Sequence, residues 1–216
     1  MKNNSVSLFC FLLCFLTLSQ ARAFLGLHES GEIIPAGHYR VGVIPQIYIG
    51  SNPSNYYTGR ESSSDFGAFL DMNIDQDLNA RFVLGTGTTD FWAAGFAKWV
   101  PYPDYQNQPA LGVRGGLIYV REGSSNFYNT QITPLVSKHY ESDIGVLTPY
   151  VGVPITFIYE KSSNNFTALQ MAIGSDWDFQ KDSQLGVELE MDLAKTTTTV
   201  SLHLNLEFDE TKGFKK

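Results

Sequence analysis

The sequence predicts an all-β protein, namely an antiparallel up-and-down transmembrane β-barrel of about 10 strands, within a range of about 8 to 12. Three observations support this prediction. Apolar and polar residues alternate with a period of two along most of the 216-residue chain. Short runs of turn-forming residues separate the alternating segments. No stretch of comparable quality shows apolar residues at helical spacing.

The alternation is clearest near the C-terminus. Leu202, Leu204 and Leu206 alternate with His203 and Asn205, so a strand there has one apolar face and one polar face. The same pattern continues upstream with less regularity. The predicted strands are 38–50, 64–75, 79–87, 90–100, 110–121, 127–141, 145–160, 165–179, 184–194 and 197–208.

The N-terminus has the order of a secretory signal peptide. Lys2 is followed by an apolar run from Val6 to Leu18, and then by Ala21 and Ala23 at the small-residue positions of a cleavage site. The run is too short to span a bilayer as a helix. We therefore expect a cleaved signal peptide over 1–23, a periplasmic N-terminal segment over 24–37, a barrel over 38–208 and a C-terminal tail over 209–216.

Charge and cysteine content exclude several classes of function. Both cysteines, Cys10 and Cys14, lie in the predicted signal peptide, so the mature chain has no disulfide and no thiol chemistry. Of the 15 basic residues, Lys2 and Arg22 are removed with the signal, which leaves 13 against 22 acidic residues. No basic run occurs, so we expect no nucleic acid as a partner.

Alternation does not by itself tell whether the apolar face meets lipid or a soluble core. Glycines such as Gly42, Gly67 and Gly116 fall on the polar faces, where they suit a crowded lumen better than a solvent-facing strand. Aromatic residues gather at segment ends, as at the two interfaces of a membrane barrel. The predicted interface aromatics are Trp99, Tyr102, Tyr128, Tyr140, Tyr159, Trp177 and Phe208.

The signal, the alternating strands and the final Leu202-His203-Leu204-Asn205-Leu206-Glu207-Phe208 resemble a bacterial outer-membrane β-barrel protein of the small OmpA- or OmpX-like class. In that class the last strand ends in an aromatic residue, which the resemblance implies is read by the barrel-assembly machinery. Here eight residues follow Phe208, which departs from the pattern.

Prolines oppose part of the strand assignment. Pro45, Pro134, Pro149 and Pro154 all fall within predicted strands, although proline cannot donate a hydrogen bond to a ladder. Three of the four lie on the adjacent segments 127–141 and 145–160. We expect that region to be bulged or shorter than the alternation indicates.

Charged and polar residues on the polar faces are predicted to line a lumen that is largely filled or at most a narrow passage. Glu188, Glu190 and Asp192 place three carboxylates on one face, a spacing that excludes neither glycosidase chemistry nor a calcium site. Pairing with arginines and lysines across the lumen is the favoured interpretation. The predicted lumen-lining residues are Arg40, Asp71, Arg81, Lys98, Arg114, Glu188, Glu190, Asp192, Ser201, His203 and Glu207.

Ser201 and His203 share a face and suggest an enzyme alternative. Outer-membrane lipases and deacylases place a serine and a histidine near each other on one strand, usually with the histidine first and with the pair facing lipid. Here the order is reversed and the pair faces the predicted lumen. The sequence therefore favours a lumen-filling role for both residues and predicts no catalytic residue.

The leading functional hypothesis is a structural or passive role in the outer membrane, which includes a narrow solute channel or surface contacts through Tyr56, Tyr57 and Arg60. The expected partners are outer-membrane lipids and the barrel-assembly machinery, with the solute or surface ligand left open. We expect no cofactor and no metal, since the histidines are dispersed. Two alternatives stay open, the lipid hydrolase and a soluble exported lipocalin-like barrel with an apolar pocket.

Overall fold

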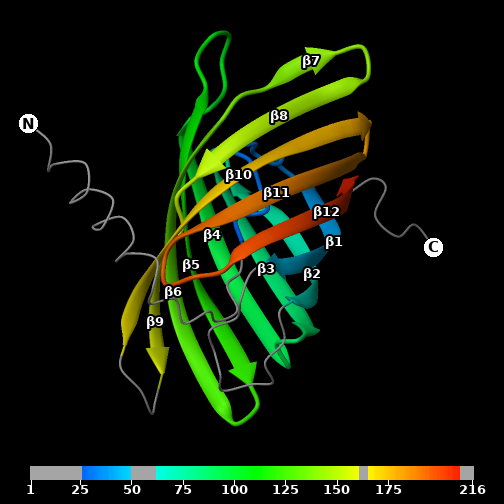
Figure 1. The fold of residues 1–216 in the computed structure, drawn as a ribbon. Coiled ribbons are helices and arrows are strands. Elements are labelled where there is room, and N and C mark those ends of the chain that lie inside the picture. The colour runs from blue at the N-terminus through cyan, green and yellow to red at the C-terminus, as the bar shows by residue number, and fades with distance from the viewer. Residues whose placement is uncertain (1–25, 50–61, 161–164, 210–216) are drawn as a thin grey trace, which may run out of the picture.

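A closed ring of antiparallel strands forms the body of the protein (Figure 1). The computed structural model describes residues 26–49, 62–160 and 165–209. Within these residues β1 pairs with β12, which closes a barrel of 10 strands, and no helix is long and apolar enough to cross a membrane. The strands are β1 (His38–Ile49), β2 (Ser62–Asp75), β3 (Leu78–Gly87), β4 (Phe91–Tyr102), β5 (Ala110–Glu122), β6 (Ser125–Ser137), β7 (Tyr140–Ser142), β8 (Gly145–Gly152), β9 (Ile155–Glu160), β10 (Phe166–Gln180), β11 (Ser183–Ala194) and β12 (Thr198–Asp209).

The predicted fold class is confirmed, and one region differs in detail. The segment predicted as 145–160 is divided into β8 and β9 at Val153 and Pro154, and β7 continues β6 after a short break. The register runs through both breaks unchanged, from Phe127 opposite Glu160 to Tyr140 opposite Leu147. Pro45, Pro134 and Pro149 lie inside β1, β6 and β8, and Pro154 lies at the break before β9. No bulge is added at Pro154, whose carbonyl still accepts a hydrogen bond from the amide of Gln170 at 3.0 Å.

The barrel is apolar on its outer surface. On β12, Leu202, Leu204 and Leu206 are 43–48% exposed, whereas the alternating His203 and Asn205 are 1–2% exposed. Large hydrophobic residues are exposed in the same way on the other strands. A soluble lipocalin-like barrel would turn this row inward, so the distribution is that of a transmembrane barrel.

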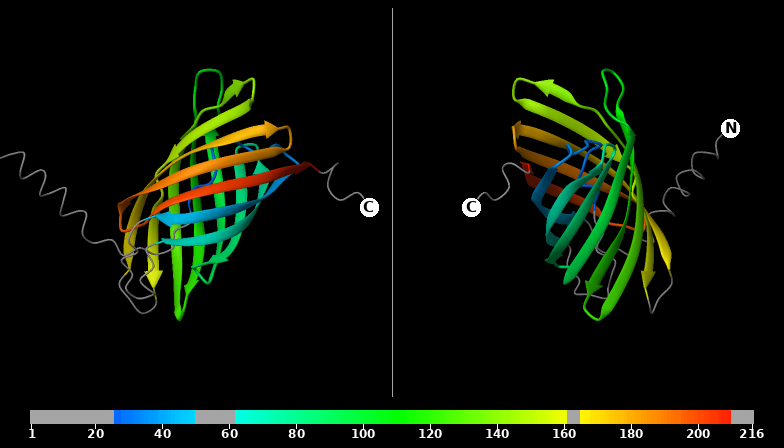
Figure 2. Two further views of the ribbon diagram at one scale, coloured as in Figure 1. Left: turned by 45° about the vertical axis from the view of Figure 1, so that its right-hand side comes forward. Right: turned by 180° about the vertical axis from the view of Figure 1, so that it is seen from behind.

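The predicted interface aromatics fall into two groups along the barrel. We call the end where β1 begins and β12 ends the terminal end, and the opposite end the far end (Figure 2). Because neighbouring strands are antiparallel, strand direction places each residue at one end. Trp99, Tyr102, Tyr140, Trp177 and Phe208 lie toward the terminal end, and Tyr128 and Tyr159 lie toward the far end.

Glycines on the inner face make room for aromatic rings from neighbouring strands. The ring of Trp92 lies over Gly67 and Gly85, and the ring of Phe69 lies over Gly42. A Cβ atom at any of these glycines would overlap the ring beside it. The glycines on the polar faces therefore leave space for flat side chains, which explains their position in otherwise regular strands.

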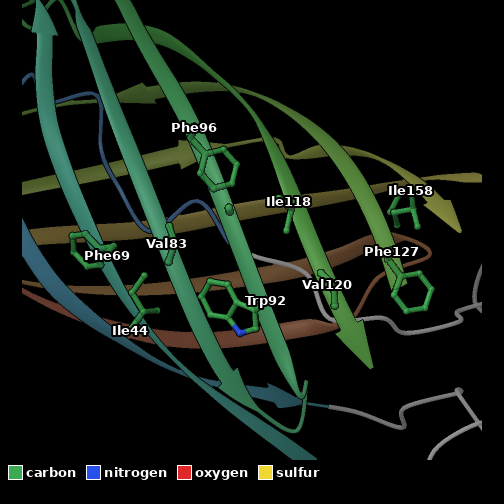
Figure 3. Packing of buried hydrophobic residues seen from close by; sticks show 11 residues of the cluster. Ile44, Phe69, Val83, Trp92, Phe96, Ile118, Val120, Phe127 and Ile158 are labelled. Atoms are coloured by element: carbon green, nitrogen blue, oxygen red, sulfur yellow. The ribbon is translucent and has the colours of Figure 1, made fainter. Parts of the chain in front are cut away.

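The lumen is divided along its axis, which the sequence analysis did not predict. Inward-facing Phe69, Val83, Trp92 and Phe96 pack with Ile118 and other apolar residues in the half toward the far end (Figure 3). Asp71, Arg81, Lys98 and Arg114 lie on the same strands but nearer the terminal end, as Arg81 does relative to Val83. Asp65 is the exception: it is buried nearer the far end and accepts a hydrogen bond from the Tyr48 hydroxyl at 3.0 Å. Period-two alternation predicts which residues point inward but not how they vary along the axis.

Leu204→Arg tests which surface of β12 faces hydrocarbon. Arginine near the middle of a lipid-facing strand costs about 2–4 kcal/mol, so the free energy of unfolding from vesicles should fall by that amount. Leu204→Ala removes volume without adding charge, so it should lower the free energy of unfolding by much less. Equal losses for the two variants would contradict a lipid-facing position.

Replacing Gly85 with alanine tests whether the ring of Trp92 needs the space over this glycine. The added methyl group overlaps the indole ring, and overpacking of this kind costs about 1–3 kcal/mol. Gly95→Ala is the matched control on the neighbouring strand, because the nearest heavy atom to its Cβ would be 3.7 Å away. Urea titration of both variants in detergent should show a loss for Gly85→Ala only, and the account fails if Gly95→Ala is equally harmful.

Candidate functional site in the barrel lumen

Three cations form one wall of the charged half of the lumen. Arg81, Lys98 and Arg114 come from the successive strands β3, β4 and β5, and their side chains are 1–6% exposed. Arg81 is held by both carboxylate oxygens of Asp71 at 2.6 Å. The guanidinium groups also lie over aromatic rings, Arg81 over Phe69 at 4.4 Å and Arg114 over Phe96 at 4.1 Å. We call Arg81, Lys98 and Arg114 the basic wall.

Three carboxylates lie across the lumen on β10 and β11. Asp176 accepts a hydrogen bond from His203 Nε2 at 2.9 Å, with the ring nitrogen as donor, and Glu188 accepts one from the hydroxyl of Tyr150 at 2.8 Å. Glu190 is fully buried beside them. We call Asp176, Glu188 and Glu190 the acidic wall.

The N-terminal segment lies between the two walls, drawn in dark blue inside the ring of strands in Figure 1. Leu27, His28, Glu29 and Ser30 are all at most 6% exposed. Residues 24–37 are predicted from the sequence to form a periplasmic segment. The structure instead places the described part, from Gly26, among the lumen side chains, and the chain turns at Gly37 to enter β1.

The basic wall binds the carbonyl groups of this segment. Arg114 donates hydrogen bonds to the carbonyls of Gly26 and Leu27 at 2.9 and 2.6 Å, and Arg81 donates to that of His28 at 2.7 Å. The Lys98 ammonium group donates to the carbonyls of Ser30 and Glu32, both at 2.8 Å. These are charge-assisted bonds, which are stronger than neutral ones.

The acidic wall binds the amide groups of the same segment. The Leu27 amide donates to Glu190 at 3.1 Å, the His28 amide to Glu188 at 2.8 Å, and the Ser30 amide to Asp176 at 3.2 Å. His28 has a positive φ of 50°, so the chain makes a local turn that holds its amide and carbonyl toward opposite walls. The segment thus bridges the two walls through its main chain.

The side chain of Glu29 points into the basic wall. Its carboxylate lies 2.9 Å from Lys98 Nζ and 3.5 Å from Arg114 Nη1. Burial alone would raise the pKa of Glu29, but Arg81, Lys98 and Arg114 outweigh it and lower this pKa to about 2. A carboxyl group with a lowered pKa stabilises the folded state above its usual pKa and loses that contribution only as the pH falls toward 2. Mild acidification therefore leaves the Glu29 contact in place.

A second charged cluster closes the lumen at the terminal end. Arg40 donates to Glu207 at 2.7 Å and to Glu32 of the segment at 3.0 Å, and His38 Nδ1 lies 2.8 Å from Glu207. Two cavities of about 500 and 560 Å³ flank the segment there, and both are lined by Glu32 and Ile33. The segment therefore divides the mouth of the barrel.

The structure brings most of the predicted lumen residues together and separates two of them. Arg40, Asp71, Arg81, Lys98, Arg114, Glu188, Glu190, His203 and Glu207 take part in the contacts described above or lie beside them. Asp192 instead accepts hydrogen bonds from the amide and hydroxyl of Thr196 in the turn after β11. Ser201 is buried, and its hydroxyl has no hydrogen-bond partner in the part of the chain that the structure describes.

Ser201 and His203 do not form a nucleophile and base. The hydrogen bond of His203 goes to Asp176, and the serine hydroxyl donates none to the imidazole. A catalytic serine needs a base within hydrogen-bond reach, so this geometry does not support the lipid hydrolase alternative. Tyr56, Tyr57 and Arg60, the predicted surface contacts, lie outside the described residues. Among residues 26–49, 62–160 and 165–209, no group of three potential ligands could hold a metal ion.

Sequence reasoning missed Glu29, Glu32 and Asp176 as members of the site. Asp176 lies on an inward-facing position of β10, so the alternation could have identified it. Glu29 and Glu32 carry no such signal, because the segment before β1 is not a strand. The one indication in the sequence is an excess of cations on three consecutive inner faces, with Asp71 of the preceding strand β2 as the acid opposite Arg81.

Comparison with solved structures supports the fold. A COG4313 outer membrane channel from Pseudomonas putida F1 is similar, with a TM-score of 0.52 and 13% identity over 87% of this chain and 100% of that chain. The N-terminal barrel of Pseudomonas aeruginosa OprF has a TM-score of 0.37 and 10% identity over 80% of this chain and 98% of that chain. No protein-family model and no curated protein matches the sequence. The closed antiparallel fold and its apolar outer surface together define a transmembrane type of β-barrel.

Arg81→Met tests the ionic pairing inside the lumen. The substitution leaves Asp71 buried without its cation, and a broken buried pair costs about 3–5 kcal/mol. Arg121→Met removes a positive charge from the exposed end of β5 and should change the free energy of unfolding by less than about 0.5 kcal/mol. A similarly small effect for Arg81→Met, measured by guanidinium unfolding in vesicles, would show that the pair is not needed.

Proposed function

We propose that this protein is an outer-membrane barrel that its own N-terminal segment keeps closed. Its role is structural in this state, and it becomes a narrow solute passage only when the segment leaves the lumen. The observation that carries the proposal is the bridge between the basic and acidic walls, which Gly26–Glu32 makes with its main chain. Export on a cleaved signal peptide, location in the outer membrane, contact with its lipids and assembly by the barrel-assembly machinery are parts of the same proposal.

The outer surface supports the location. Its exposed apolar residues need hydrocarbon, and the two aromatic groups suit the two interfaces of a bilayer. The similar Pseudomonas putida protein is an outer membrane channel by its description. A barrel of this size has a lumen that inward side chains nearly fill, so a general-diffusion pore is disfavoured and a small passage is the most that the fold allows.

The segment is suited to leave the lumen without unfolding the barrel. It pairs with no strand of the sheet, and its contacts are to side chains. Cleavage after Ala23 would leave two residues before Gly26, so the segment would have a free end. Withdrawal would expose the charges of both walls to water, which replaces the lost hydrogen bonds and lowers the cost of opening.

Conductance across a planar bilayer tests the closed state. The chain from Phe24 onward should conduct rarely, and a variant that lacks residues 24–34 should conduct steadily, because the passage between the walls is then free. Glu29→Ala, which weakens the segment without shortening it, should open more often than the full chain. Glu141→Ala, a change at an exposed position, serves as the charge-matched control and should behave like the full chain.

A steady conductance of the full chain as large as that of the shortened variant would contradict the proposal. A second adverse result is a shortened variant that shows the heat-modifiable gel mobility of a folded barrel and still does not conduct. That result would overturn the solute passage and leave only the structural role.

A further inference from the structure

The lumen recognises the main chain of the segment. From Gly26 to Glu32, five carbonyls accept hydrogen bonds from the basic wall, and the amides of Leu27, His28 and Ser30 donate to the acidic wall. The Gly31 amide donates to the hydroxyl of Ser137 at 3.0 Å. These groups belong to the peptide bond and are present in every peptide.

Donors and acceptors are segregated between the walls. Arginine and lysine only donate, and ionised carboxylates only accept. A ligand that satisfies both walls must present acceptors on one side and donors on the other, as a peptide backbone does. A simple anion or cation would satisfy one wall and leave the other unpaired.

The lumen also has places for two side chains of the segment and for one glycine. Leu27 packs with Leu135, Tyr150 and Ala172 in a small apolar cluster. The carboxylate of Glu29, two residues later, meets Lys98 and Arg114. Gly31 is confined, because a Cβ there would lie 2.8 Å from the Ser137 hydroxyl oxygen. The order is thus an apolar residue, an acidic residue and a small residue at alternate positions.

Binding capacity remains on the acidic wall with the segment in place. One carboxylate oxygen of Glu188 and one of Glu190 are buried and accept no hydrogen bond among the described residues. Glu188 Oε1 lies 3.6 Å from His28 Nδ1, whereas Glu190 Oε2 has no such contact in the described part of the chain. A buried carboxylate oxygen without a donor is unusual and indicates a site that a further N–H group can use.

We propose that the lumen is a peptide-binding site, which the N-terminal segment occupies in cis. When the segment is out, the same walls bind a short peptide supplied from solution, with an apolar residue followed two positions later by an acidic one. This inference rests on the proposed function, because the site becomes free only if the segment can leave.

Calorimetry in detergent tests this with the variant that lacks residues 24–34. The probe is an acetylated and amidated peptide, Gly-Leu-His-Glu-Ser-Gly, which has the sequence of residues 26–31. The matched control has the same side chains and charge but carries N-methyl groups on the Leu, His and Ser nitrogens, so it donates no hydrogen bond to the acidic wall. The probe should bind saturably, and the N-methylated peptide should bind about tenfold more weakly or worse.

Two protein controls accompany the measurement. The full chain should bind the probe more weakly than the shortened variant, because its own segment fills the site. Arg114→Met in the shortened variant should weaken binding, and Arg121→Met on the outside of the same strand should not. If the shortened variant does not fold, a full-length chain with Leu27→Asp and Glu29→Lys replaces it, because these changes expel the segment from the apolar cluster and from the basic wall.

Equal binding of the normal and N-methylated peptides overturns the proposal, and so does absence of saturable binding to a folded variant. Conductance separates this failure from that of the proposed function. If the shortened variant conducts but binds no peptide, the proposal of a closing segment stands and the proposal of a peptide site fails. If the shortened variant binds the peptide but never conducts, the proposal of a peptide site stands and the proposal of a solute passage fails.

Discussion

Charges buried inside the barrel must be paired with one another or with main-chain groups, because neither the hydrocarbon outside nor the apolar rings of the far half of the lumen can solvate them. Asp71 pairs with Arg81 on the neighbouring strand, but Lys98 and Arg114 have no acid on β3 to β5 beside them. Their partners are the carbonyls of the N-terminal segment and the carboxylate of Glu29. In the closed state the cations of the charged half are therefore paired by this segment, although it is not part of the sheet.

The rest of the barrel follows from the same requirement of close packing. Inward aromatic rings lie over glycines of the next strand, so the wall can bend around a narrow lumen without strained side chains. Large apolar residues are exposed on the outer face of the long strands, which suits a barrel surrounded by hydrocarbon. The prolines near β8 and β9 interrupt the strand locally but leave its register with both neighbours intact, so the closed ring survives them.

The strands, their inward faces and most lumen charges were predictable because a period of two follows directly from strand geometry. Arg81, Lys98 and Arg114 were assigned to the lumen in this way. Their actual partners were not predictable, since residues 26–34 form no strand, and contacts such as Ser30 with Asp176 are separated by more than a hundred residues in the sequence. The packing of the Trp92 ring over Gly67 and Gly85 was not predictable for a related reason. The glycines were recognised as lumen residues, but which ring covers them depends on the register between strands.

Accessibility of a single cysteine tests most directly whether the segment lies inside the barrel. In a chain in which Cys10 and Cys14 are removed with the signal peptide or replaced by serine, Ser30→Cys introduces a thiol at a buried lumen position, and Ala36→Cys introduces one at the exposed turn before β1. A water-soluble thiol reagent should label position 36 rapidly and position 30 at least about tenfold more slowly, because reagent reaches position 30 only in the open state. Equal labelling rates at both positions would show that the segment lies outside the lumen and would contradict this account.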